Sequence, residues 1–295
     1  MKVLFVAVFD PNSTNNCQAR GFEQNGWKVI KYDYRLSLQK FGSVPARDQH
    51  LIDLCIKEAP NLVLFSKCNI MDSRVIDECN KVAKSAMWYM DDIHNADLEL
   101  RTKLTKCDYV FYTCESLAEF FKKYNQNSHF LHQCPDEKLN YLIPNAEYSR
   151  DVCFIGHIGG GSHRERLMYK KEVKFDHVQG VFGLDHNKMV NECKINLSFA
   201  AADQAGVSVR TYKILASAGF LMTSPWHDME NTFKDGKHLV VFNSPEELKE
   251  KIEYYLKNPE ERDKIRFAGH KEAQKYMPNR WAKNIIDTIF KREQP

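Results

Sequence analysis

The sequence predicts an α/β protein built from two Rossmann-like domains, each with a parallel sheet flanked by helices. Short apolar segments of strand character alternate with helical patterns, as in sheets that are covered on both faces. This alternation pauses over residues 140–150 and then restarts. The chain of 295 residues is also long for one compact core. We therefore predict domains over residues 1–149 and 150–279, followed by a last helix within residues 280–295.

In the first half, apolar and β-branched runs predict six strands. These strands are Val3–Phe9, Lys28–Tyr32, Leu62–Ser66, Ala86–Met90, Tyr109–Thr113 and His129–Leu131. Helical patterns separate them, at Asn16–Asn25, Arg47–Glu58, Ser73–Lys84, Ala96–Thr105 and Ser116–Tyr124. The polar segment from Asn140 to Arg150, which contains Pro144, is typical of a linker.

The second half repeats this order. Its predicted strands are Val152–Gly156, Phe175–Val178, Ile195–Phe199, Phe220–Thr223 and Leu239–Phe242. Its predicted helices start at Arg164, span Asn187–Cys193, Val209–Ala218 and Pro245–Leu256, start at Pro259, and span about Arg280–Lys291. Ser244 followed by Glu247 has the spacing of a capping box.

Composition places the chain among soluble cytoplasmic proteins. The nine cysteines are dispersed and include no CxxC pair, which favours free thiols in a reducing compartment over disulfides or a structural zinc site. No apolar run approaches the roughly 20 residues of a membrane span. The apolar N-terminus continues into Asp10 and Pro11 and predicts a buried strand, not a signal peptide. The net charge of +3 does not by itself imply nucleic-acid binding.

Loops that follow strands are the expected ligand sites, because open parallel sheets bind ligands at the carboxyl ends of their strands. The loop after the first strand lacks a G-x-G-x-x-G motif, which argues against NAD there. A glycine-rich loop follows the strand that ends at Gly156, and it leads through His157 into a helix that begins at Arg164. Glycine backbone, a helix N-terminus and basic side chains together favour an anion. An exposed loop without a ligand is the alternative.

A second basic segment starts a helix in the same half. Ser208 is suited to cap the helix, and Arg210, Lys213 and Ser217 share one helix face. Cations in the first turns oppose the helix dipole by a few tenths of a kcal/mol each, a cost that a bound diphosphate would reverse. Gly219 is the expected C-terminal cap. A solvated charged face is the alternative interpretation.

Residues 210–223, RTYKILASAGFLMT, resemble the R-x-F-E-x-L-A-x-G-x-F-L-x-T block of GT-B glycosyltransferases, in particular the spore-maturation-protein-like group. The resemblance extends from about Asp151 to the end of the chain. It implies two Rossmann-like domains facing across a cleft, with a nucleotide-sugar donor on the second and the acceptor on the first. It also implies that the last helix packs back on the first domain. The nucleotide sugar would be a co-substrate, with no metal and no other cofactor.

The resemblance assigns roles to the basic residues of the second half. Arg164, Arg210 and Lys213 would stabilise the charge that develops on the leaving diphosphate, and Ser208 and Thr211 would add neutral donors. Gly156 and His157 complete the predicted donor site. Lys213 stands where the family has a glutamate that bonds the donor ribose, and a lysine cannot accept hydroxyl hydrogen bonds. The reaction class is therefore better defined than the donor.

The base for the acceptor hydroxyl is expected in the first domain. Asp92, just after a strand, is our candidate, with His94 as its competitor. Asp91 is expected to cap the next helix, and Asp10 is a further candidate base. Adjacent aspartates in a strand point to opposite sides, which argues against a metal-binding pair at Asp91 and Asp92.

Two alternatives remain open at the level of sequence. Because Lys213 replaces the glutamate, the chain could instead be a non-catalytic nucleotide-binding protein of the same fold. The acceptor could also be a modified base in DNA, since residues 150–295 carry a net charge of +4 against −1 for residues 1–149.

Overall fold

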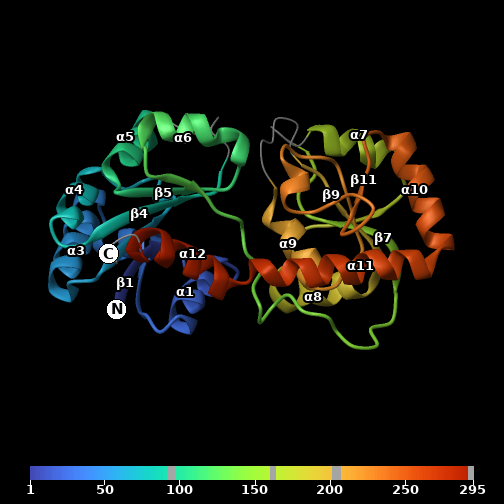
Figure 1. The fold of residues 1–295 in the computed structure, drawn as a ribbon, viewed down its shortest axis with the longest axis horizontal. Coiled ribbons are helices and arrows are strands. Elements are labelled where there is room, and N and C mark those ends of the chain that lie inside the picture. The colour runs from blue at the N-terminus through green and yellow to red at the C-terminus, as the bar shows by residue number, and fades with distance from the viewer. Residues whose placement is uncertain (92–96, 160–163, 201–206, 292–295) are drawn as a thin grey trace. The chain divides into compact units, whose positions relative to one another are not determined.

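The computed structural model describes residues 1–91, 97–159, 164–200 and 207–291, together with the backbone but not the side chain of Arg164. It divides into two compact units (Figure 1). Unit 1 contains Met1–His132 and Pro278–Pro295, and unit 2 contains Gln133–Met277. The last helix therefore belongs to the first unit, as the fold prediction required.

Unit 1 contains a six-stranded parallel sheet in the order β2-β1-β3-β4-β5-β6. The strands are β1 Lys2–Ala7, β2 Lys28–Asp33, β3 Leu62–Ser66, β4 Lys84–Tyr89, β5 Tyr109–Tyr112 and β6 Ser128–Phe130. The helices are α1 Asn15–Gln24, α2 Tyr34–Phe41, α3 Val44–Glu58, α4 Arg74–Asn80, α5 Leu98–Lys106, α6 Ala118–Tyr124 and α12 Pro278–Phe290. All six strands lie where the apolar runs predicted them, within about two residues.

Helix α2 was not predicted, although its two ends carry the usual signals. The Asp33 carboxylate accepts from the backbone N–H groups of Arg35 and Leu36 at the N-terminus. Gly42 ends the helix with a left-handed φ of 74°. The helix buries only Tyr34, so it lacks the apolar stripe on which the sequence assignment depended.

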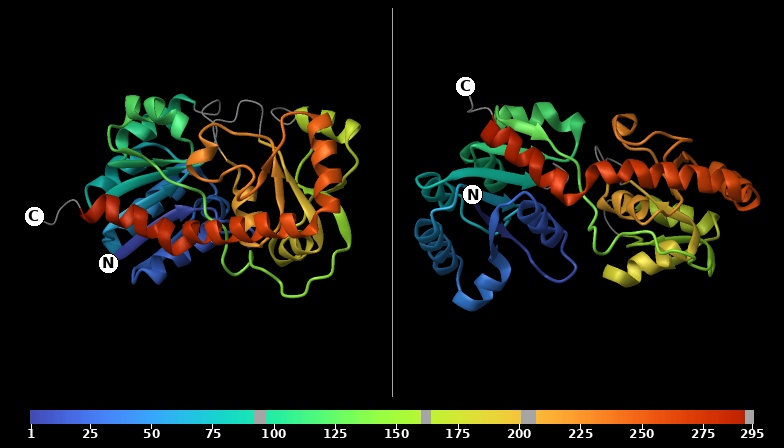
Figure 2. Two further views of the ribbon diagram at one scale, coloured as in Figure 1. Left: turned by 45° about the vertical axis from the view of Figure 1, so that its right-hand side comes forward. Right: turned by 60° about the horizontal axis from the view of Figure 1, so that its bottom comes forward.

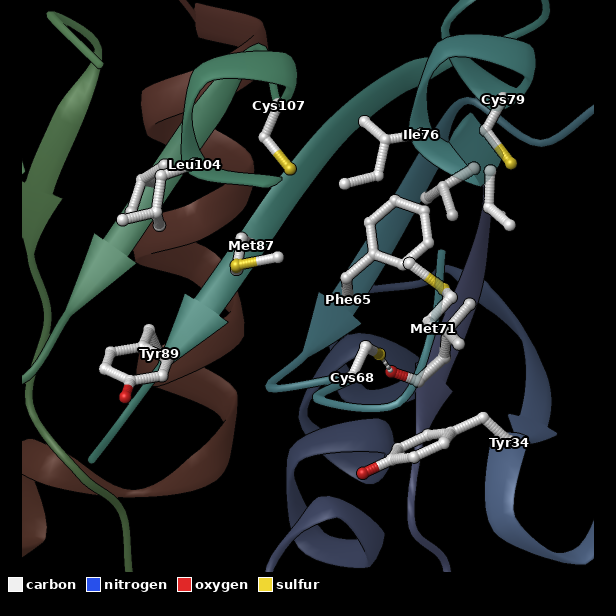
Figure 3. Packing of buried hydrophobic residues seen from close by; sticks show 14 of the residues in the cluster. Tyr34, Phe65, Cys68, Met71, Ile76, Cys79, Met87, Tyr89, Leu104 and Cys107 are labelled. Atoms are coloured by element: carbon white, nitrogen blue, oxygen red, sulfur yellow. Dashed lines mark hydrogen bonds between the residues drawn. The ribbon is translucent and has the colours of Figure 1, made fainter. Parts of the chain in front are cut away.

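One face of the unit 1 sheet is covered by α3, α4, α5 and α6. Figure 3 shows Phe65 of β3 and Met87 of β4 among Ile76 and Leu104 from the covering helices. Cys68, Cys79 and Cys107 are part of this core. All nine cysteines are free, as predicted, and the structure shows that all are buried.

The other face is covered by α1 and α12, which lie side by side although they come from opposite ends of the chain (Figure 2). Trp281 of α12 is buried and meets Trp88 of β4 edge-on, with ring centroids 5.3 Å apart. It meets Phe22 of α1 in the same way at 6.1 Å. A Cβ on Gly21 of α1 would overlap the carbonyl group of Pro278, so glycine permits this close approach.

Unit 2 contains a five-stranded parallel sheet in the order β11-β10-β9-β7-β8. The strands are β7 Arg150–Ile155, β8 Asp176–Val178, β9 Cys193–Ser198, β10 Leu221–Thr223 and β11 Val240–Val241. The helices are α7 Arg164–Glu172, α8 Gly183–Asn191, α9 Val209–Ala216, α10 Pro245–Lys257 and α11 Pro259–Ala273. Apolar side chains of α7 and α10 pack on one face, and those of α8 and α9 pack on the other. Helix α11 contributes Ile265 to the first core and Ala273 to the second.

The segment predicted as a linker is attached to unit 2. The N–H of Tyr141 donates to the Asn187 side chain at 3.1 Å, and that of Ile143 to the Asn191 side chain at 2.9 Å. The N–H of Ser149 donates to the Glu192 carbonyl at 2.9 Å. These bonds explain why the second compact unit starts at Gln133, whereas the sequence places the domain boundary after residue 149.

The end of α9 differs from the expectation that Gly219 caps it. The left-handed residue is Ala218, with a φ of 54°. This residue occupies the position of the glycine in the glycosyltransferase-like block. Gly219 is needed instead for packing, because a Cβ there would lie 2.7 Å from Val190 Cγ1 and 2.9 Å from Ile214 Cγ2.

The capping box of α10 is also modified. The Glu247 N–H donates to the Ser244 hydroxyl at 3.1 Å, as predicted. The Glu247 carboxylate, however, accepts from the N–H of Asn243 at 2.7 Å, one residue before the cap. The Ser244 side chain therefore binds a backbone N–H of the first helical turn, and the Glu247 side chain binds a backbone N–H just before the helix.

We predict that Trp281→Ala lowers the free energy of unfolding of unit 1 by about 3–5 kcal/mol, because it removes the buried contacts to Trp88 and Phe22. Urea denaturation measures the loss. The exposed Asn284 of the same helix provides the control, since Asn284→Ala should change stability by less than about 0.5 kcal/mol. Equal effects of the two changes would refute the packing role.

At the end of α9, we predict opposite effects of two neighbouring changes. Ala218→Gly should stabilise unit 2 by up to about 1 kcal/mol, because glycine adopts the left-handed conformation without steric cost. Gly219→Ala should destabilise it by about 1–3 kcal/mol through overpacking. Thermal unfolding of both variants tests this, and a lower stability of Ala218→Gly would contradict the left-handed conformation of Ala218.

Candidate donor site in the second unit

A cavity of about 570 Å³ lies in unit 2 where the strand order reverses. From β7 the chain passes to β8 on one side of the sheet and then to β9 on the other. The connections that leave the carboxyl ends of β7 and β9 therefore run to opposite sides of the pair, which is where open α/β sheets bind ligands. The described lining is Ile155, Gly156, His157, Gln179, Gly180, Val181, Phe182, His186, Ser208, Val209, Arg210 and Lys213.

Arg210 is held at the centre of this lining. Ser208 begins α9 as its N-cap, and its hydroxyl accepts from the Arg210 N–H at 3.3 Å. The half-buried guanidinium donates through Nε to the Ile155 carbonyl at 2.9 Å and lies 5.0 Å from the centre of the Phe154 ring. Its Nη1 is buried and has no hydrogen-bond partner among the described residues. Burial and the nearby Arg166 lower the pKa of Arg210 to about 10.

The absence of a side chain at Gly156 leaves space for the Arg210 guanidinium. A Cβ at this residue would overlap Nη2 of the guanidinium. The glycine thus acts by leaving space for a side chain, in addition to any approach of a ligand to its backbone. His157 follows it, and its Nδ1 lies 3.3 Å from Oε1 of Gln179, which also lines the cavity.

A second arginine near Arg210, which is Arg166 of α7, was not identified from the sequence. It is buried, and it donates to the carbonyls of His157 at 2.9 Å and Phe199 at 3.1 Å. It lies 5.6 Å from the Phe154 ring, and its Nε has no partner among the described residues. Arg166 shares the helical spacing of the buried Tyr169 and Val173, a signal that could have found it. Arg164, the predicted contact, begins α7, but its side chain lies outside the described residues.

The remaining predicted residues of α9 divide between the cavity and the interior. Lys213 lines the cavity beside Arg210, one turn along the helix. Thr211 is buried and does not belong to the described lining, so its predicted role as a donor to the ligand is not supported by its position. Ser217 is also buried, and its hydroxyl donates to the Lys213 carbonyl.

His186 of α8 is a further lining residue that the sequence did not reveal. It is 8% exposed, and its Nδ1 is buried without a partner among the described residues. Burial, with repulsion from Lys213 and Arg210, lowers its pKa to about 4. The imidazole is therefore neutral at pH 7 in the unliganded protein.

In unit 1, Asp92 and His94 lie outside the described residues. Asp91 does not cap the next helix; its carboxylate pairs with Lys67 at 2.6 Å. The cap of α5 is Asp97, which accepts from the N–H of Leu100 at 2.7 Å. Asp10 accepts from the N–H of Asn12 at 3.0 Å in an exposed turn.

Among the described residues, no helix combines the length and apolarity that crossing a bilayer requires. No curated protein sequence matches the chain significantly.

Solved structures share the fold over nearly the whole chain. HepE from Anabaena, in complex with UDP and glucose, has a TM-score of 0.67 at 10% identity and covers 98% of this chain and 99% of its own. Sucrose-phosphate synthase from Thermosynechococcus elongatus has a TM-score of 0.67 at 10% identity, covering 99% and 98%. The lipopolysaccharide outer core galactosyltransferase WaaB has a TM-score of 0.61 at 9% identity, covering 99% and 100%.

These likenesses show the GT-B fold. The family described as "Glycosyl transferase-like" matches residues 139–287, which include the cavity, both arginines and the whole of α9. The match covers half of the chain, and the chain belongs to this glycosyltransferase family.

Proposed function

We propose that the protein transfers a sugar from a nucleotide-sugar donor to an acceptor hydroxyl, and that the donor diphosphate binds against Arg210 and Lys213. The observation that carries the proposal is the buried Nη1 of Arg210, which has no hydrogen-bond partner among the described residues. It belongs to a cavity whose described lining contains no acidic residue. A buried cationic donor without an acceptor is costly, and an anionic ligand supplies the missing partner.

The charge distribution supports a diphosphate in particular. Two guanidinium groups, of Arg166 and Arg210, lie near the Phe154 ring, and the charge of Arg166 disfavours the charge of Arg210. Lys213, one helical turn after Arg210 in α9, adds a third cation. A diphosphate brings enough negative charge and enough oxygen acceptors to offset this repulsion. The volume of about 570 Å³ is within the usual range for small-molecule sites.

The same residues account for catalysis. When the sugar leaves, negative charge develops on the nucleoside diphosphate, and prearranged cations stabilise it. Arg210 is prearranged by its bond to the Ile155 carbonyl, so little reorganisation is needed during the reaction. The HepE complex with UDP and glucose, a structure of the same fold, supports a nucleotide-sugar donor.

The acceptor side is proposed from sequence. Asp92 stays the proposed base and His94 its alternative, and both follow β4 in the sequence. The acceptor is a hydroxyl compound of unspecified class, and a modified base in DNA is one option. Salt-sensitive DNA binding would support that option, and no affinity at low salt would remove it.

A calorimetric and thermal-shift screen of nucleoside diphosphates and their sugars tests the donor site. We expect at least one to raise the melting temperature, because a ligand that binds only the folded state stabilises it. Arg210→Ala and Lys213→Ala should remain folded and should each lower turnover by roughly 100-fold or more. Lys249→Ala, which removes an exposed cation of α10, is the control. Full activity of both cavity variants would refute the assignment.

We also predict that turnover does not depend on a metal ion, since cations of the chain take the charge-stabilising role. Activity should be unchanged after dialysis against EDTA. A loss of activity that Mg²⁺ or Mn²⁺ restores would contradict this prediction and favour a metal site at Asp91 and Asp92.

A further inference from the structure

His186 is a buried ionisable group that the proposed reaction does not use. It lies in α8, on a different element from the cations of α9, yet it lines the same cavity as Arg210 and Lys213. Its Nδ1 is unpartnered among the described residues. An unpaired buried polar atom in a ligand cavity indicates that the unliganded state is incomplete there.

We propose that binding of the donor diphosphate is coupled to protonation of His186, so that this histidine strengthens donor binding as the pH falls. The inference rests on the proposed function, because it concerns the same cavity. It adds a residue to the donor site and a direction to its pH dependence.

The electrostatic surroundings explain the coupling. The charged groups that act on the imidazole are Lys213 and Arg210 of α9, and both disfavour its protonation. Its own helix carries Asp185 and Lys188, and neither contributes to the shift. The negative charge of a diphosphate bound between Lys213 and Arg210 would offset their repulsion of a protonated His186 and would attract the proton. Burial still opposes protonation, so the anion is required for it.

The direction in which donor affinity changes with pH follows from the linkage between ligand binding and proton binding. With a pKa of about 4 in the free protein, His186 is neutral from pH 5 upward. If the anion raises this pKa, binding takes up a proton at pH values between the free and bound pKa. Affinity then increases as the pH falls through the bound pKa, by at most about tenfold per pH unit for one proton.

The test measures the affinity of the tightest-binding nucleotide sugar from the screen between pH 5 and 8. A nucleotide sugar is the right probe because its diphosphate is esterified at both ends and does not titrate in this range. Calorimetry in two buffers of different ionisation enthalpy counts the protons taken up. We expect proton uptake and rising affinity toward pH 5 in the native protein, and loss of both in His186→Gln.

His227→Gln is the matched control, since His227 lies in the same unit, is exposed, and is not part of the described lining. It should keep the native pH dependence. His157 also lines the cavity and is unchanged in both variants, so it cannot produce a difference between them. If His186→Gln binds with the same pH dependence and proton uptake as the native protein, the inference is wrong while the donor site stands. If no nucleotide sugar binds at any pH, the proposed function itself fails.

Discussion

The hydrogen bond from Arg210 Nε to the Ile155 carbonyl ties the N-terminus of α9 to the carboxyl end of β7. This one contact joins two segments that are more than 50 residues apart in sequence. It directs the remaining guanidinium nitrogens toward the point where the strand order of the second sheet reverses. Gly156 leaves the space for it, and Ser208 starts the helix that presents it. The proposed donor site is arranged around this contact.

Positive charge is concentrated here at a cost to the unliganded protein. Arg166 and Arg210 lie near one aromatic ring, and no described residue of the lining is acidic. The lowered pKa values of Arg210 and His186 express the same repulsion and burial. Hydrogen bonds to backbone carbonyls, from Arg166 to His157 and Phe199, hold one of these cations without neutralising it. An anion bound among these cations would offset their repulsion, which is the property that a donor site needs.

Close packing of neutral groups, in contrast to the charged groups of the cavity, holds each unit together. In unit 1, the last helix supplies Trp281 to a sheet formed by the first part of the chain, so the core requires both ends of the sequence. In unit 2, Gly219 and the left-handed Ala218 allow α9 to end close to α8 and to enter β10 directly. The direction of α9, and with it the position of Arg210 and Lys213, depends on this tight turn.

The sequence by itself determined the order of the strands and, except for α2, of the helices, together with the parallel sheets and the location of the proposed donor segment. Apolar runs, caps and a family-like block are local signals, and they predicted Ser208, Arg210 and Lys213 where the cavity is found. Only the tertiary structure decided what depends on contacts between distant segments. His186 enters the described lining because α8 packs beside α9, and Arg166 of α7 lies near Arg210 at the Phe154 ring without being part of that lining. Thr211 is buried and also lies outside the described lining. Likewise Ala218, not Gly219, ends the helix, because Val190 and Ile214 leave no space for a side chain at the following position.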